Sequence, residues 1–169
     1  MLLETPICDF GWQAPSFELK DPNGKSFSYN DVVGEKGLLV IFMCNHCPYV
    51  QRIIDDLVSV TNDLQNHGIG VVGIMSNNYE THPDDAPDKM LEFAQDTGMN
   101  FPYLVDETQE VARAYDAVCT PDFFGFNKDG GLQYRGNMDG LLKAMTQIAE
   151  TGQGPEEQVP SMGCSIKWK

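Results

Sequence analysis

Residues 38–48 read Leu38-Leu39-Val40-Ile41-Phe42-Met43-Cys44-Asn45-His46-Cys47-Pro48, and this stretch indicates the fold class. Its first six residues form an unbroken apolar run, which is typical of a strand buried on both faces. From Val50 to Leu64 the apolar residues recur at helical spacing, so an amphipathic helix is expected to follow and to end near Gly68. The two cysteines therefore lie where a buried strand leads into a helix.

On both sides of this junction, strands and helices are expected to alternate. Residues 16–29 and 123–134 each contain a turn sequence flanked by apolar residues, and each predicts a hairpin. The remaining apolar periodicity predicts strands at residues 69–75 and 101–105, and helices around residues 90–94, 108–115 and 138–149. This order predicts a single α/β domain over residues 1–169. We expect a thioredoxin-like fold, with a mixed central sheet flanked by helices, an N-terminal β-hairpin extension and an irregular C-terminal tail from about residue 151.

The charge of the chain limits its classes of partner. Asp and Glu number 25 against 11 Lys and Arg, and the formal net charge is -14. Such a surface repels phosphate groups, so we exclude nucleic acid and anionic membranes as main partners. The chain begins without a basic segment and apolar run of signal type, and no apolar stretch reaches the roughly 20 residues of a membrane helix. We therefore expect a soluble, cytoplasmic protein.

Cys44 and Cys47 form a C-x-x-C motif, which gains specificity from its place at the start of a helix. The unpaired N–H groups and partial positive charge of a helix N-terminus favour the thiolate, which is the nucleophilic form of cysteine. His46 lies between the cysteines and is a candidate for lowering their pKa further. Because Pro48 suits the first helical position, Cys47 is expected to cap the helix and to attack, with Cys44 as its resolving partner. The competing assignment makes Cys44 the nucleophile.

The segment Cys119-Thr120-Pro121-Asp122 comes directly before a predicted strand. A proline at this point suits a turn, with a cis Thr120–Pro121 peptide bond that faces the C-x-x-C helix. The backbone of Thr120 is then expected to be free to pair with a bound peptide. Thr120 and Pro121 are therefore candidate substrate-binding residues.

Three further cysteines are assigned lesser roles. Cys119 is expected to be a buried apolar side chain rather than a third redox thiol. Cys164 lies in the tail, which its apolar neighbours indicate to be packed down; it is either an auxiliary thiol or, as we favour, inert. Cys8 is expected to be structural or merely exposed, because an odd cysteine count does not suit a disulfide framework.

Arg135 and Asp139 are expected to be ordinary surface groups.

Five segments of the chain match one family pattern. They are Ala14-Pro15-Ser16-Phe17-Glu18-Leu19, Cys44-Asn45-His46-Cys47-Pro48-Tyr49, Cys119-Thr120-Pro121-Asp122-Phe123, Tyr134-Arg135-Gly136 and the ending Pro160-Ser161-Met162-Gly163-Cys164-Ser165-Ile166-Lys167-Trp168. With these the chain resembles the AhpC/TSA-type redoxins, and more narrowly the peroxiredoxin-like thioredoxin-family proteins that carry C-x-x-C. The resemblance implies that Cys47 corresponds to the peroxidatic cysteine of peroxiredoxins.

The chain departs from this pattern at several positions. Val40 and Cys44 stand where a peroxiredoxin has proline and threonine, and Thr120-Pro121 occupies the place of the arginine that holds the peroxide. The buried acid of thioredoxins falls on Ile41, or on Leu38 in the other register. Efficient peroxide reduction is therefore not expected, and the handling of protons must differ from that of thioredoxin.

These features favour one function and leave two alternatives. The favoured function is a thiol–disulfide oxidoreductase that cycles a Cys44–Cys47 disulfide between a protein or small-thiol substrate and a cellular reductant, with no cofactor and no metal. The first alternative is a thiol peroxidase with Cys47 as the peroxidatic cysteine. The second is binding of zinc or copper(I) by Cys44, His46 and Cys47 with Cys119 or Cys164.

Overall fold

The computed structural model describes the whole chain from Met1 to Lys169. Its strands are β1 (Leu2–Glu4), β2 (Glu18–Lys20), β3 (Ser26–Ser28), β4 (Gly37–Phe42), β5 (Ile69–Met75), β6 (Tyr103–Val105), β7 (Cys119–Thr120), β8 (Asp122–Asn127), β9 (Leu132–Tyr134) and β10 (Met162–Ser165). Its helices are α1 (Tyr29–Val32), α2 (Pro48–Asn66), α3 (Pro87–Thr97), α4 (Glu110–Tyr115) and α5 (Leu141–Thr151), with the short 3-10 helix η1 (Pro83–Asp85). No helix combines the length and the apolar character that crossing a bilayer requires.

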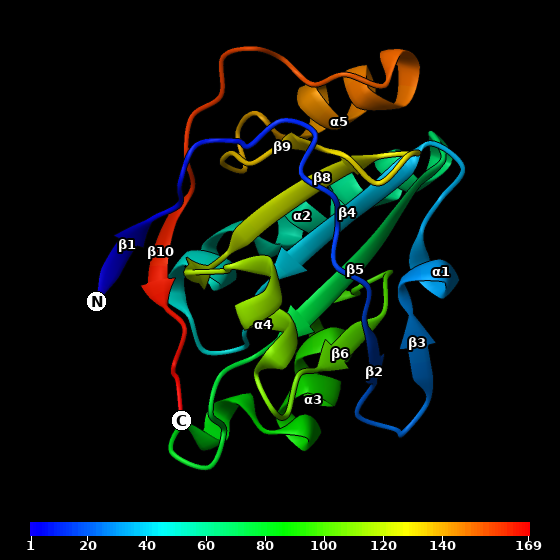
Figure 1. The fold of residues 1–169 in the computed structure, drawn as a ribbon. Helices are drawn as coiled ribbons and strands as arrows, with labels where there is room; N and C mark the ends of the chain where they lie inside the picture. The colour runs from blue at the N-terminus through cyan, green and yellow to red at the C-terminus, as the bar shows by residue number, and fades with distance from the viewer.

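The central sheet is mixed, as predicted. Two hydrogen-bonded groups of strands, β3-β2-β6-β5 and β4-β8-β9, lie side by side, and the Met43 N–H donates to the Ile74 carbonyl where they meet. β5 and β6 run parallel, whereas β4 and β8 run antiparallel. Figure 1 shows β4, β5 and β8 in the middle of the molecule.

Helices cover both faces of this sheet, and β4 supplies side chains to both. Leu39 and Ile41 pack into the cluster that also contains the buried residues of α2 and α5, while the alternate β4 residues Leu38, Val40 and Phe42 pack into the cluster with Tyr115 of α4. In Figure 1 α4 lies in front of the sheet and α2 behind it. Burial of each large apolar side chain contributes about 1.5–3 kcal/mol, so the run at 38–43 anchors the whole domain.

The predicted N-terminal hairpin is present. β2 and β3 pair antiparallel, with Leu19 opposite Phe27. The Asp21 carboxylate accepts hydrogen bonds from the backbone N–H groups of Asn23 and Lys25, both at 2.9 Å, which is the local bonding that makes aspartate a turn residue. Gly24 has φ +89°, a conformation that favours glycine.

The C-terminal tail differs from the prediction. Residues 152–161 are irregular, but β10 then forms the middle strand of a second, three-stranded sheet with the order β1-β10-β7. Cys164 lies opposite Leu2 on one side and opposite Thr120 on the other. Figure 1 shows β1 and β10, from opposite ends of the chain, running side by side. A four-residue strand without apolar alternation carries no local signal, because its pairing depends on residues more than 40 positions away.

Candidate active site

Cys47 caps helix α2, as predicted, and Pro48 is the first helical residue. The pKa of the Cys47 thiol falls from 9.0 to about 4. The main cause is the neighbouring Cys44 thiol; the Thr120 side chain and the backbone N–H groups of Val50 and Tyr49 also lower it, against the opposing effect of burial. The start of α2 thus stabilises a thiolate at Cys47.

Cys44 has the opposite character. Its pKa is raised well above 9.0, first by the neighbouring Cys47 sulfur, and further by burial and the nearby charge of Asp85. The two cysteines therefore differ in acidity, with Cys47 the thiol that ionises first. This distribution of charge favours Cys47 as the nucleophile, an assignment that stays a prediction.

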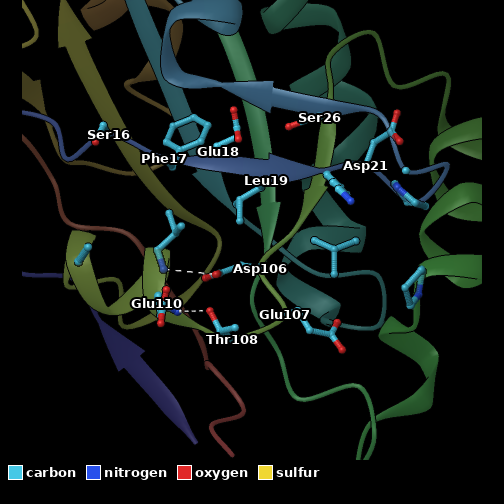
Figure 2. A pocket seen from close by; sticks show the side chains of 17 residues that line it. Ser16, Phe17, Glu18, Leu19, Asp21, Ser26, Asp106, Glu107, Thr108 and Glu110 are labelled. Atoms are coloured by element: carbon cyan, nitrogen blue, oxygen red, sulfur yellow. Dashed lines mark hydrogen bonds between the residues drawn. The ribbon is translucent and has the colours of Figure 1, made fainter.

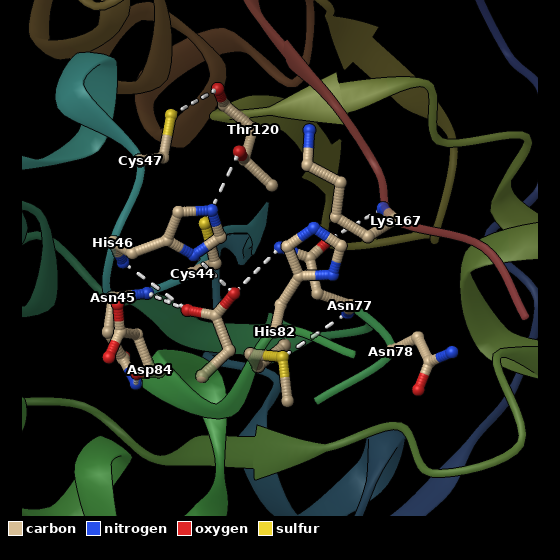
Figure 3. Close-up of polar contacts among 12 residues, drawn as sticks. Cys44, Asn45, His46, Cys47, Asn77, Asn78, His82, Asp84, Thr120 and Lys167 are labelled. Atoms are coloured by element: carbon tan, nitrogen blue, oxygen red, sulfur yellow. Dashed lines mark hydrogen bonds and ion pairs between the residues drawn. The ribbon is translucent and has the colours of Figure 1, made fainter. Parts of the chain in front are cut away.

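The cis Thr120–Pro121 segment faces the two cysteines. The Cys47 sulfur lies 3.3 Å from the Thr120 carbonyl oxygen, and the Cys44 sulfur lies 3.6 Å from the Thr120 hydroxyl. Figure 3 shows these contacts converging on Thr120. The predicted turn is therefore present and lies against the C-x-x-C motif.

The expected role of the Thr120 backbone is wrong in one respect. Thr120 is not free to pair with a bound peptide, because β10 already lies antiparallel beside it, with Cys164 opposite Thr120. The approach is so close that a Cβ atom on Gly163 would lie only 1.9 Å from the Thr120 carbonyl oxygen. The chain's own C-terminal strand thus occupies the edge at which a substrate strand was expected.

His46 points toward a carboxylate rather than toward the cysteines alone. Its Nδ1 lies 2.5 Å from Oδ2 of Asp85, and its ring stacks on His82 with centroids 5.8 Å apart. The His46 side chain is 28% exposed, so it forms part of the surface above the buried thiols. An effect of His46 on the pKa of the Cys44 thiol is therefore combined with that of the Asp85 carboxylate beside it, which raises this pKa.

Asp85 is the main site residue that sequence reasoning missed. It belongs to η1, its side chain is fully buried, and it accepts hydrogen bonds from the backbone N–H of Asn45, from that of His46 and from the Asn77 side chain. These bonds hold the loop between the cysteines in place. It lies in the polar, proline-punctuated segment 77–88, where nothing local marks this acid among the 25 acidic residues of the chain.

A metal site is only partly assembled. Cys44, His46 and Asp85 each offer one ligand atom, all within 4.8 Å of one another. A closed tetrahedral zinc site takes four ligands, and the Cys47 sulfur is not in this group. The Asp85 oxygens already accept hydrogen bonds from Asn45, His46 and Asn77, so ion binding competes with the bonds that hold the loop.

The other cysteines differ in surroundings. Cys119 is fully buried, and burial raises its pKa to about 12, which suits the predicted packing role. Cys8 is half-buried, and burial raises its pKa to about 11. Cys164 is partly exposed and packs against the cluster that contains Cys44 and Cys47. All five are free thiols in this structure.

Arg135 is not the surface group that was expected, whereas Asp139 is exposed. Arg135 is 6% exposed and holds the fully buried Asp122 with two hydrogen bonds, of 3.1 and 2.9 Å. Its guanidinium also lies 4.1 Å from the centroid of the Phe124 ring. Because Asp122 directly follows Pro121, the Arg135–Asp122 ion pair holds the cis-proline segment in place.

A broad hollow elsewhere on the surface is separate from the thiols. Figure 2 shows it between the β2–β3 hairpin and the start of α4. Its lining is rich in acidic residues and contains no cysteine or histidine. Asp106 on its wall is engaged, since it accepts hydrogen bonds from the Ala112 N–H and the Ser76 hydroxyl. Nothing in this hollow takes part in the thiol chemistry.

Two curated relatives carry different names. Over 120 residues the chain is 26% identical to the thiol-disulfide oxidoreductase ResA of Bacillus subtilis, a match that covers 71% of this chain and 63% of that protein. The chain therefore spans less than two thirds of that relative. Over 117 residues it is 26% identical to the peroxiredoxin Bcp of Escherichia coli K12, covering 69% of this chain and 70% of the other.

Solved structures agree with the fold. An uncharacterized conserved protein from Geobacillus kaustophilus is 40% identical, with a TM-score of 0.95 over 100% of this chain and 97% of its own. The thioredoxin domain of a thiol-disulfide oxidoreductase from Bacteroides vulgatus has a TM-score of 0.67 at 19% identity, over 83% of this chain and 97% of its own. The AhpC/TSA family pattern matches residues 10–135. The chain therefore belongs to the AhpC/TSA family of thiol-based redox proteins and has the thioredoxin-like fold.

Proposed function

We propose that the chain is a thiol–disulfide oxidoreductase that cycles a disulfide between Cys44 and Cys47. The observation that carries the proposal is the placement of both sulfurs against Thr120 at the start of α2, 3.3 Å from its carbonyl oxygen for Cys47 and 3.6 Å from its hydroxyl for Cys44. In this arrangement the pKa of Cys47 is lowered and that of Cys44 is raised. A thiolate beside a thiol that retains its proton provides both the nucleophile and the resolving group of an exchange reaction.

The exchange requires two displacements at sulfur. The Cys47 thiolate attacks a substrate disulfide, forms a mixed disulfide and releases the first substrate thiolate. Cys44 then gives up its proton and attacks the Cys47 sulfur, which releases the second substrate thiolate and leaves the Cys44–Cys47 disulfide. Two electrons have passed from the protein to the substrate. A dithiol reductant of the cell restores the pair by the reverse steps.

The test is a redox titration of the two cysteines, followed by thiol labelling and mass spectrometry. We expect a reversible Cys44–Cys47 disulfide in the wild-type chain and its loss in Cys47→Ser. Cys8→Ser serves as the matched control and should titrate like the wild type. If Cys44 and Cys47 remain free at every potential, the proposal is wrong.

Peroxide reduction remains the second candidate, because the Cys47 thiolate is the reactive form and one relative is named a peroxiredoxin. The Cys47 sulfur would then attack the peroxide, release an alcohol or water and become a sulfenate. The Cys44 thiol would attack that sulfur, release the sulfenate oxygen as water and give the same disulfide. Stopped-flow kinetics with hydrogen peroxide separate the two candidates. Oxidation of Cys47 no faster than that of a free thiol excludes the peroxidase function.

A further inference from the structure

The two cysteines of the proposed pair lie beneath the surface. Cys44 is 1% exposed and Cys47 is 0% exposed. Disulfide exchange needs the attacking thiolate to reach a sulfur atom directly, so an external partner reaches these two buried sulfurs only when the surrounding structure opens locally. Cys164, by contrast, is partly exposed and contacts the same cluster.

β10 holds Cys164 in place beside the buried pair. Cys164 lies opposite Thr120, whose carbonyl oxygen is 3.3 Å from the Cys47 sulfur. Figure 3 shows the C-terminal segment, as a red ribbon, passing Thr120 on its way to Lys167. The strand is fixed on both sides, because β1 pairs with its other edge and the Ser161 hydroxyl donates to the Pro121 carbonyl at 3.0 Å.

The chemistry of Cys164 follows the state of Cys47. Burial raises the pKa of Cys164, and the neighbouring Cys47 with its charge raises it further; Lys167 and the N-terminal amine act in the other direction. When Cys47 enters a disulfide, it loses its negative charge and no longer raises the pKa of Cys164. Cys164 is therefore a protonated thiol beside the reduced pair and becomes more acidic once the pair is oxidised.

We propose that Cys164 is the third thiol of the redox site, through which the buried Cys44–Cys47 pair exchanges disulfides with thiols in solution. The proposal rests on the disulfide cycle proposed above. It assigns a role to the C-terminal strand, and it reverses the expectation from the sequence that Cys164 is inert.

In reduction by an external thiol, the relay has three balanced displacements. The Cys164 thiolate attacks the Cys47 sulfur of the Cys44–Cys47 disulfide, giving Cys47–Cys164, and Cys44 leaves and takes up a proton. An external thiolate attacks the Cys164 sulfur and expels Cys47, whose low pKa makes it the best leaving group of the three. A second external thiolate then releases the external disulfide and frees Cys164. Two electrons pass to the protein, and each step is reversible.

The first test traps the intermediate in Cys44→Ser, in which the usual partner of Cys47 is absent. Oxidation with glutathione disulfide, followed by peptide mapping, is expected to show an intramolecular Cys47–Cys164 disulfide. The bond should persist in Cys44→Ser/Cys8→Ser and be replaced by a glutathione adduct on Cys47 in Cys44→Ser/Cys164→Ser. If Cys47 of the single variant carries only glutathione while Cys164 stays free, the relay is wrong.

The second test measures the rate at which reduced glutathione opens the Cys44–Cys47 disulfide. Cys164→Ser is expected to slow this step about tenfold or more, because the thiol that reaches solvent is gone. Cys8→Ser should match the wild type, and circular dichroism verifies that each variant is folded. An unchanged rate in Cys164→Ser overturns the relay but leaves the Cys44–Cys47 cycle intact, since the titration tests that cycle separately.

Discussion

The midpoint potential of the Cys44–Cys47 pair is expected to fall by only about 30 mV per pH unit between about pH 5 and pH 8. The thiolate at Cys47 is the reason. Between its pKa of about 4 and the much higher pKa of Cys44, the reduced pair holds a single proton, so two electrons enter with one proton. A pair of ordinary thiols takes up two protons and falls by about 59 mV per pH unit.

The lowered pKa of Cys47 also raises the midpoint potential of the Cys44–Cys47 pair. At pH 7 a pKa of about 4 instead of 9.0 stabilises the reduced form by about 4 kcal/mol, because only the reduced form has a titrating sulfur. For a two-electron couple this raises the potential by about 90 mV relative to a pair without the shift. The stabilisation declines as the pH falls toward about 4, where Cys47 takes up its proton, and the slope then steepens to about 59 mV per pH unit.

The assay equilibrates the protein with glutathione buffers at several pH values, quenches with acid and counts free thiols by mass spectrometry. Cys8→Ser is the matched control and should give the same slope. A slope of about 59 mV per pH unit across the whole range from about pH 5 to pH 8 would refute the reasoning, because it would mean that Cys47 is protonated there.

Asp85→Asn is expected to lower the free energy of unfolding by about 1–3 kcal/mol in urea denaturation, because the buried amide cannot accept all the bonds of the carboxylate. Arg135→Met should cost about 3–5 kcal/mol, since it leaves Asp122 buried without a partner; adding Asp122→Asn should recover part of this loss, and additive losses would contradict the pairing. Gly163→Ala should displace β10 and speed alkylation of Cys47 by iodoacetamide about tenfold, if local opening becomes easier by about 1.4 kcal/mol. Unchanged labelling in a folded Gly163→Ala would show that β10 does not restrict access.

Local patterns in the sequence identified the elements that carry the cysteine pair. The apolar run before Cys44 and the helical spacing after Pro48 correctly predicted β4 and α2, and the proline correctly marked Cys47 as the cap. The cis peptide bond before Pro121 also followed from its place ahead of a buried strand. These features depend on residues within one element, so a short stretch of sequence carries the whole signal.

The features that the sequence did not show depend on contacts between distant segments. Asp85 reaches the loop at Asn45 from 40 residues away, and Arg135 meets Asp122 across the β8–β9 hairpin. Each of these is one charged residue among many, in a segment that also suits an exposed loop. Their burial is favourable only because the tertiary structure supplies a partner of opposite charge or several hydrogen-bond donors.

The sequence by itself therefore determined the α/β order, the C-x-x-C motif at the start of a helix and the cis-proline segment of this protein. Only the tertiary structure decided what surrounds Cys47: the Cys44 thiol that stabilises its charge, and the strand β10 that brings Cys164 beside it. The physical reason is the range of the interactions. Helix and strand periodicity is encoded over a few neighbouring residues, whereas the pairing of β10 with β1 and β7 joins the two ends of the chain to its middle and has no local signature.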